Sequence, residues 1–265
     1  MKPGIYWDIP FNEYLALPYR SKSALHEFSK SPALHKGRLD GTIGRASSAD
    51  FELGSAVDAM WVEQRTPSEA GYAIRPRGLN LKTSEGKEWR SAVSPGITIV
   101  PHTVADMVRS LESNARAMEL RQAGSAQATL IWDCPITGMR MKGRPDLLEL
   151  KSHAVIADLK TTRSIEYHAF RSDFSKYNYH WQMCLYGNAI IELGLCETFE
   201  AWIIAVDKTP PHGVACRPVS DASLEVAAAE LKKLLLKYAE CALSDHWPAH
   251  DEHERPLELP RWRMT

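Results

Sequence analysis

Residues 143–164 read GRPDLLELKSHAVIADLKTTRS, and this stretch places charged side chains inside two hydrophobic segments. The segments Met139–Leu150 and Ala154–Thr161 have the composition of β-strands, and the polar residues between them are typical of a turn. We therefore expect a hairpin centred on Ser152. Because side chains alternate along a strand, one face of the second strand carries charges and the other carries apolar groups.

The charged face of this hairpin holds two carboxylates and an ammonium group. A turn centred on Ser152 places Asp146 opposite Asp158, and Lys160 projects from the same face as Asp158. Like charges that face each other across a hairpin destabilise it unless another group cancels them. The pattern therefore fits two hypotheses: a site for a hard divalent cation such as Mg²⁺ or Mn²⁺, or a solvated face with an Asp–Lys ion pair. The spacing alone does not decide between them.

The composition is that of a globular chain without a strong net charge. Its 265 residues are 44% hydrophobic and 25% charged, with a formal net charge of -1, so any binding of nucleic acid depends on local patches. No apolar run reaches the roughly 18–20 residues that span a bilayer, and the first residues lack the order of a signal peptide. We expect a cytoplasmic protein without membrane contact. Five cysteines without a Cys-x-x-Cys pair argue against a disulfide framework and a zinc ribbon.

Hydrophobic periodicity predicts the remaining elements. The expected helices are Lys22–Lys30 (capped by Ser21), Phe51–Glu63, Thr103 to about Ala123, Tyr179–Leu193 and Leu224–Leu243. The expected strands are residues 97–100, Ala128–Trp132, Glu200–Val206 and Val214–Val219, and residues 66–94 are expected to form a loop or lid. Ala128–Trp132 adds a third strand to the hairpin and makes an antiparallel meander. The order indicates one α/β domain of the α+β type, with a central mixed sheet flanked by helices.

Several further sequence motifs occur together with the hairpin. The hairpin starts with GRPD, its second strand ends in ADLKTT, and a helix follows with YHWQMCLYG. Together they resemble the PD-(D/E)xK nuclease superfamily and, within it, the RecE-type exonucleases (exodeoxyribonuclease VIII) of phages and prophages. GIYWDIPFNEY and SKSALHEFSKSPAL near the start, ELGSAVDAMWVE, and the WPA and LPRW of the tail are also similar to that family.

The resemblance covers nearly the whole chain and implies a domain organisation. It implies a single nuclease domain over residues 1–265 with a restriction-endonuclease-like core. Within it, residues 1–50 would be a family-specific segment, about 51–245 the nuclease core and 246–265 a C-terminal tail.

The resemblance also implies a catalytic site. Asp146 and Asp158 would bind the metal with the backbone carbonyl of Leu159, and Lys160 would orient the attacking water and offset charge on the phosphate. Asp58 would complete the all-oxygen shell that Mg²⁺ prefers. Family members usually have a histidine at this position, so the aspartate either still binds the metal, changes the metal preference or weakens activity.

A second group of candidate residues surrounds these carboxylates. Gln182 and Tyr186 are four residues apart and share a helix face, and the resemblance places such a pair at the border of the site, although Tyr186 fits a core position equally well. Arg144 and Lys142 alternate with Asp146 and either contact a phosphate or balance the carboxylates. Thr161 and Thr162 either bind the DNA backbone or reflect strand propensity.

The function implied by the resemblance is a Mg²⁺-dependent exodeoxyribonuclease, with Mn²⁺ also supporting activity. It would degrade linear double-stranded DNA from 5′ to 3′ and leave 3′ overhangs for phage-type recombination. The implied partners are double-stranded DNA ends, a single-strand annealing protein of the RecT type and further copies of the chain in a ring, in a bacterial host cell. The alternatives are a catalytically weakened scaffold that binds DNA, or a single-strand or structure-selective endonuclease.

Overall fold

The computed structural model of the chain describes residues 1–44, 48–249, 256, 258 and 259. Its helical segments are α1 (Phe11–Ala16), α2 (Lys22–Lys30), α3 (Pro32–Leu39), α4 (Ala49–Val57), η1 (Asp58–Val62), α5 (Ser84–Ala92), α6 (Thr103–Glu112), α7 (Ala115–Ala123), α8 (Tyr167–Lys176), α9 (Tyr179–Glu192) and α10 (Asp221–Ser244). Its strands are β1 (Gly4–Tyr6), β2 (Tyr72–Ile74), β3 (Thr98–Val100), β4 (Ser125–Ala126), β5 (Thr129–Asp133), β6 (Arg140–Gly143), β7 (Leu147–Leu150), β8 (Ala154–Thr162), β9 (Phe199–Asp207) and β10 (Val214–Pro218). The LPRW motif expected in the tail lies mostly outside the described residues.

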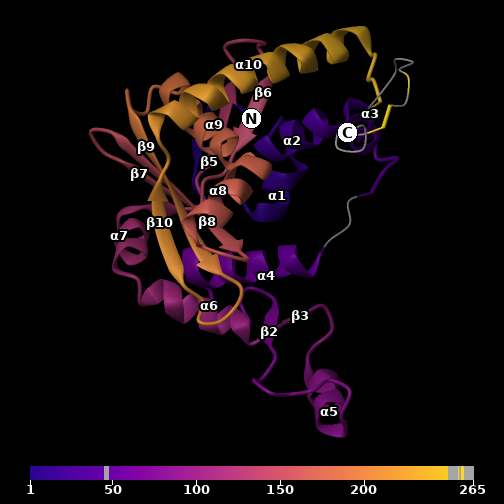
Figure 1. Cartoon of the computed structure of the whole chain (residues 1–265), viewed down its shortest axis with the longest axis vertical. Helices are drawn as coiled ribbons and strands as arrows, with labels where there is room; N and C mark the ends of the chain where they lie inside the picture. Colours follow the sequence, from indigo (N-terminus) through magenta and orange to yellow (C-terminus); the bar gives the residue numbers. More distant parts are fainter. Residues whose placement is uncertain (45–47, 250–255, 257, 260–265) are drawn as a thin grey trace.

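The main sheet has five strands in the order β10-β9-β8-β7-β4 (Figure 1). Strands β8 and β9 are parallel, and the β7–β8, β9–β10 and β4–β7 pairs are antiparallel. This confirms the expected mixed sheet flanked by helices. None of the helices in the described part of the chain is both long and apolar enough to cross a membrane.

The predicted strand Met139–Leu150 is wrong, because the structure divides it into two strands of different sheets. Strand β6 pairs with β5 in a small sheet of order β1-β5-β6, whereas β7 pairs with β8 in the main sheet. The break falls at Arg144–Asp146, where Pro145 has no N–H to donate to a ladder. The continuous antiparallel meander is therefore also wrong.

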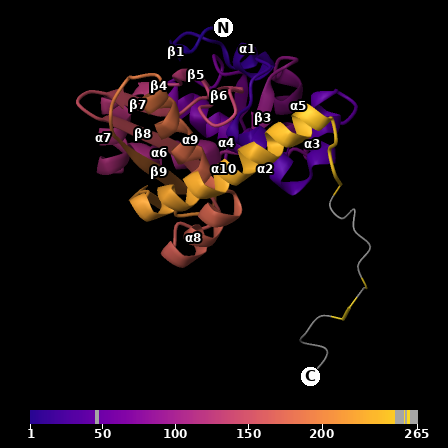
Figure 2. The same cartoon turned by 90° about the horizontal axis from the view of Figure 1, so that it is seen from above.

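Helices cover both faces of the main sheet (Figures 1 and 2). The side chains of β8 alternate between two buried clusters. Ala154 and Ile156 belong to the cluster formed with α9 and α10. Ala157 and Leu159 belong to the cluster formed with α4, η1, α6 and α7. The charged face of β8 is therefore covered by protein, which contradicts the hypothesis of a solvated face.

Several predicted helices change where a local signal interrupts the periodicity. The expected helix from Thr103 to Ala123 is two helices, because Asn114 begins α7 and its side-chain oxygen accepts from the Ala117 N–H at 3.0 Å. The expected helix Phe51–Glu63 changes from α to π geometry at Asp58. The expected loop 66–94 contains β2 and α5.

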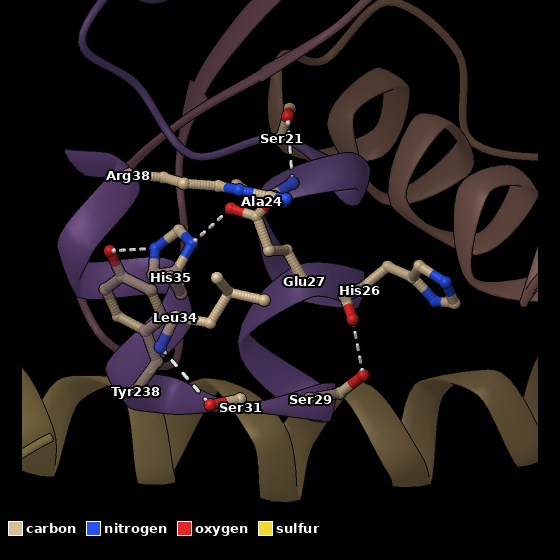
Figure 3. A network of polar contacts seen from close by, with 10 residues as sticks. All are labelled: Ser21, Ala24, His26, Glu27, Ser29, Ser31, Leu34, His35, Arg38 and Tyr238. Atoms are coloured by element: carbon tan, nitrogen blue, oxygen red, sulfur yellow. Dashed lines mark hydrogen bonds and ion pairs between the residues drawn. The ribbon is translucent and has the colours of Figure 1, made fainter. Parts of the chain in front are cut away.

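A buried polar network ties the first helices to the last one (Figure 3). His35 of α3 contacts Glu27 of α2 through Nδ1 at 3.2 Å and the hydroxyl of Tyr238 of α10 through Nε2 at 3.1 Å. Arg38 forms an ion pair with the same glutamate. Because buried polar groups need partners, these contacts define how α2 and α3 sit on α10.

Candidate active site

The β7–β8 register brings Asp146 and Asp158 to the same point of the sheet. Leu147 pairs with Ala157, so Asp146, which precedes Leu147, lies opposite Asp158, as a turn centred on Ser152 predicts. Asp146 lies just outside β7 and its Oδ2 accepts from the backbone N–H of Leu159 at 2.7 Å. The carboxylate thus takes the place of a backbone carbonyl that the break at Pro145 removes from the ladder.

The backbone carbonyl of Leu159 points to the same side of β8 as its N–H group. In an extended strand the N–H and C=O of one residue point to the same side, and the Leu159 N–H points to Asp146. The predicted main-chain ligand therefore lies at the same edge as Asp146.

Asp158 is buried and held by two side-chain donors. It is 1% exposed, its Oδ2 forms an ion pair with Lys160, and its Oδ1 accepts from Gln182 Nε2 at 3.0 Å. The Asp–Lys ion pair considered from the sequence is present, but inside the protein.

A short chain of hydrogen bonds leads from Asp158 to the GRPD segment. Gln182 Nε2 also donates to the hydroxyl of Tyr186 at 2.9 Å, and that hydroxyl donates to the Arg144 carbonyl at 3.0 Å. The Tyr186 ring lies on Gly143, where a Cβ would be 2.8 Å from the ring carbons. The two helix residues predicted to border the site thus connect Asp158 to the strand break, and both candidate roles of Tyr186, core packing and site contact, are combined in one residue.

Asp58 lies at the first position of the π-helical turn η1 and is partly exposed. Burial, followed by the charges of Asp158 and Glu63, raises the pKa of Asp58 to about 7, although Lys160 opposes the shift. Single π turns within helices are frequent at functional sites. The charges of Asp158 and Lys160 both act on the pKa of Asp58, so the three side chains share one electrostatic environment.

The donor chemistry of these residues fits a hard divalent cation. Burial and the charges of Asp158 and Asp58 raise the pKa of Asp146 well above its usual range, so the ionised carboxylates repel one another in the protein alone. A divalent cation would remove this repulsion, and all the oxygen donors named above suit it. Within residues 1–44 and 48–249, however, no group of three His, Cys, Asp or Glu side chains is arranged so that it could hold a metal ion. Any metal site here would therefore depend on the Leu159 carbonyl and on water as well as on carboxylates.

The structure assigns Lys142 to the protein interior and not to DNA. It is 7% exposed, and its Nζ donates to the carbonyls of Tyr14, Leu15 and Leu17 at 2.8, 3.1 and 2.8 Å. The predicted alternation with Asp146 is wrong because the strand breaks between these residues. Lys142 binds the carbonyls at the C-terminal end of α1, which a cation stabilises.

The other predicted DNA contacts differ in their accessibility. Arg144 is partly exposed, and it donates through Nε to Gln127 Oε1 and through Nη1 to the Ile9 carbonyl, both at 2.7 Å. Thr161 is partly exposed beside α4, whereas Thr162 is buried and its hydroxyl contacts Ser164 and Asp173. Thr162 is therefore a structural residue, and the DNA contacts of Arg144 and Thr161 stay predictions.

Lys22 and Tyr179, which no sequence pattern placed at the catalytic site, border Lys160. The Lys22 and Lys160 ammonium groups lie 5.4 and 5.0 Å from the centroid of the Tyr179 ring, and Lys22 Nζ donates to the Tyr177 carbonyl at 2.6 Å. Burial and the charge of Lys160 lower the pKa of Lys22 to about 7. Hydrophobic periodicity predicts the helix that begins at Lys22, but it gives no signal that this lysine lies beside Lys160.

Comparison with known proteins supports a shared fold. A family model described as "PDDEXK-like domain of unknown function (DUF3799)" matches residues 21–255. The chain matches no curated protein sequence. A crystal structure of a candidate exonuclease from Eubacterium rectale superposes with a TM-score of 0.67 at 16% identity and covers 96% of either chain. A crystal structure of a phage related exonuclease from Haemophilus somnus 129PT gives a TM-score of 0.38 at 14% identity, over 86% of this chain and 96% of that one, which is too low to establish a common fold.

Proposed function

The chain belongs to the family of PDDEXK-like domains described as DUF3799, and from this membership we propose that it is a metal-dependent deoxyribonuclease. We propose further that it is a RecE-type exonuclease, which degrades linear double-stranded DNA from 5′ to 3′ and leaves 3′ overhangs. The motif resemblance over nearly the whole sequence supports this choice. A similar fold is present in the candidate exonuclease from Eubacterium rectale.

One observation carries the proposal: Asp146, Asp158 and Lys160 meet where β7 begins and β8 continues. Asp146 is fixed by the Leu159 N–H, and Asp158 is fixed by Lys160 and Gln182. Residues that are held by neighbouring hydrogen bonds keep a reactive geometry without reorganisation. A purely structural ion pair would not need a second, repelling carboxylate beside it.

Each residue of the site would have a separate role in hydrolysis of the phosphodiester bond. A bound Mg²⁺ or Mn²⁺ would activate water and neutralise charge on the phosphate. Asp146, Asp158, the Leu159 carbonyl and Asp58 would hold it. Burial alone would lower the pKa of Lys160, but the charges of Asp158 and Asp146 raise it above its ordinary value, so Lys160 stays protonated and acts as a cation.

The partners follow from the same resemblance. The product strand would be coated by a single-strand annealing protein of the RecT type, and a ring of several copies of the chain would enclose the DNA. A ring would keep the enzyme on one DNA end during many cycles.

The test is release of nucleotides from linear duplex DNA labelled at the 5′ end or internally, with Mg²⁺ or Mn²⁺. We expect the wild type to release the 5′ label first and to leave circular DNA intact, and we expect Asp158→Asn to be inactive. Asp40→Asn is the matched control, because it removes only an exposed carboxylate that pairs with Lys36. Cutting of circular DNA would instead show an endonuclease.

A second candidate, a DNA-binding module on a weakened nuclease scaffold, is favoured by one observation. Both oxygens of Asp158 are engaged by protein donors, and no three-residue metal group is present among the described residues. If the wild type is inactive with either metal and Asp58→His restores cutting, the scaffold is weakened at that position. A shift of circular DNA on a gel without cutting would then identify binding as the function.

A further inference from the structure

The segment between β2 and β3, residues 75–97, projects from the body of the protein and is called the arm below (Figure 1). Its sequence holds five basic residues and two acidic ones, a net charge of +3. The whole chain has a formal net charge of -1, so the residues outside the arm carry -4. A small projecting part of the protein thus has a net positive charge, whereas the remainder is net negative.

Three of the five basic residues of the arm line one cavity. An open cavity of about 630 Å³ is lined by Lys82, Lys87, Arg90, Leu81 and Ser91. Lys87, Arg90 and Ser91 share one face of α5, because residues three and four apart are neighbours on a helix. Glu85 and Glu88 form no ion pair with Lys82, Lys87 or Arg90 in the described part of the chain.

These three cations have no partner among the described residues. Lys82, Lys87 and Arg90 are exposed and form no ion pair or side-chain hydrogen bond there. Arg77 differs, because its Nη2 lies 2.7 and 2.8 Å from the two carboxylate oxygens of Asp106 on α6. One arginine therefore attaches the arm to the body, and the other cations remain available to a ligand.

The arm has an ordered tip and not a loose loop. Thr83 caps α5, with its hydroxyl accepting from the Gly86 N–H at 3.2 Å and donating to the Asn80 carbonyl at 2.7 Å. Gly86 packs against residue 80 so closely that a Cβ would lie 2.0 Å from the Asn80 oxygen. The start of the helix that carries Lys87 and Arg90 is therefore fixed by close contacts with residue 80.

The root of the arm lies beside the candidate active site. Tyr72 and Ile74 of β2 pack on the buried cluster that contains Val57 and Trp61, which flank Asp58. The turn that carries Asp58 and the base of the arm thus share one core. A ligand in the active site that extends beyond it in this direction meets the arm.

We propose that the basic face of the arm binds the sugar-phosphate backbone of duplex DNA outside the catalytic site. The inference rests on the proposed function for its choice of ligand, because a nuclease substrate is a polyanion longer than the site. Three cations without counter-ions on a fixed surface match regularly spaced phosphates, which Lys and Arg bind through charge and hydrogen bonds. The arm would hold the duplex while the catalytic residues act on one strand.

The test compares Lys82→Gln/Lys87→Gln/Arg90→Gln with the matched control Glu85→Gln/Glu88→Gln on the same helix. Binding of a labelled duplex is measured by fluorescence anisotropy in EDTA, which prevents metal-dependent hydrolysis, at several salt concentrations. The logarithm of the association constant falls linearly with the logarithm of the salt concentration, and each lost phosphate contact makes this slope less steep by about 0.9. The slope of the triple variant should therefore be less steep than that of the wild type by about 2–3. We also expect its KM to rise at least about tenfold with unchanged kcat, because only a phosphate-positioning contact is lost.

The result separates this inference from the proposed function. If the triple variant keeps the affinity and salt slope of the wild type, the arm does not bind DNA, whatever the hydrolytic activity. If the wild type binds duplex through the arm but hydrolyses no DNA, the proposed function fails and the arm contact stands. Melting temperatures of both variants that equal the wild-type value show that a loss of affinity does not come from unfolding.

Discussion

Replacing Lys142 by methionine removes an ammonium group that donates to three carbonyls near the end of α1. The methionine retains most of the apolar stem, so the change isolates the charge and its hydrogen bonds. The same substitution at Lys208 is the matched control, because that ammonium lies 2.8 Å from the exposed carboxylate of Asp50.

The size of the effect follows from the contacts. Each of the three hydrogen bonds to the ammonium group contributes about 1.5–3 kcal/mol to the free energy of unfolding. The cost of desolvating the buried ammonium offsets several kcal/mol of this sum, so the net loss of stability should be roughly 3 kcal/mol. In a domain of this size, about 1 kcal/mol changes the Tm by about 2–4 °C, so we expect Lys142→Met to melt roughly 6–12 °C lower. An exposed ion pair contributes about 0–1 kcal/mol, so Lys208→Met should melt within a few degrees of the wild type.

Differential scanning calorimetry of the two variants and the wild type measures this. The KM for DNA is then measured below the melting temperature of each protein. If Lys142→Met melts like the wild type and raises the KM for DNA, Lys142 contacts phosphate and our assignment of its role is wrong.

Three further predictions concern the site. Gly143→Ala places a Cβ 2.8 Å from the ring of Tyr186, and such overpacking costs about 1–3 kcal/mol, so Tm and kcat should both fall; an unchanged kcat would show that the ring position does not matter. The pKa of Asp58, raised from 3.8 to about 7 by burial, predicts that the metal-free protein loses stability as the pH rises through this window, since the unfolded chain ionises first. Melting temperatures from acid to neutral pH should show this decline in the wild type and less of it in Asp58→Asn, and equal profiles would refute it. The pKa of Lys22, lowered to about 7 by burial, predicts that its positive charge is lost above neutral pH. The KM for DNA should therefore rise with pH in the wild type, and the same rise in Lys22→Gln would exclude a role for this charge.

Part of the site is predictable from local pattern. The polar turn at Ser152 and the alternation of β8 are enough to place Asp146 opposite Asp158, because a hairpin register depends on its turn. The four-residue spacing of Gln182 and Tyr186 is enough to put them on one face of α9, where they share a hydrogen bond.

Other features depend on distant partners and were not predictable. Pro145 breaks the strand, and its two halves then pair with different strands, a choice that the local pattern does not contain. The carbonyl of Tyr14 that accepts from Lys142 comes 128 residues earlier in the chain. A buried lysine with such partners looks, in the sequence, like a surface cation beside an acidic residue.

The contact between His35 and Tyr238 joins residues 203 positions apart, and it has a consequence for folding during synthesis. The helices α2 and α3 leave the ribosome early, but the surface on which they pack includes α10, which is made late. Contacts between such distant parts of a chain form slowly, because the loop between them must close first. Until residue 238 has left the ribosome, His35 lacks the tyrosine hydroxyl that its Nε2 contacts. A truncation before Tyr238 would thus leave the helix that carries Lys22 without part of the surface that α10 provides, even though every carboxylate of the site is already present.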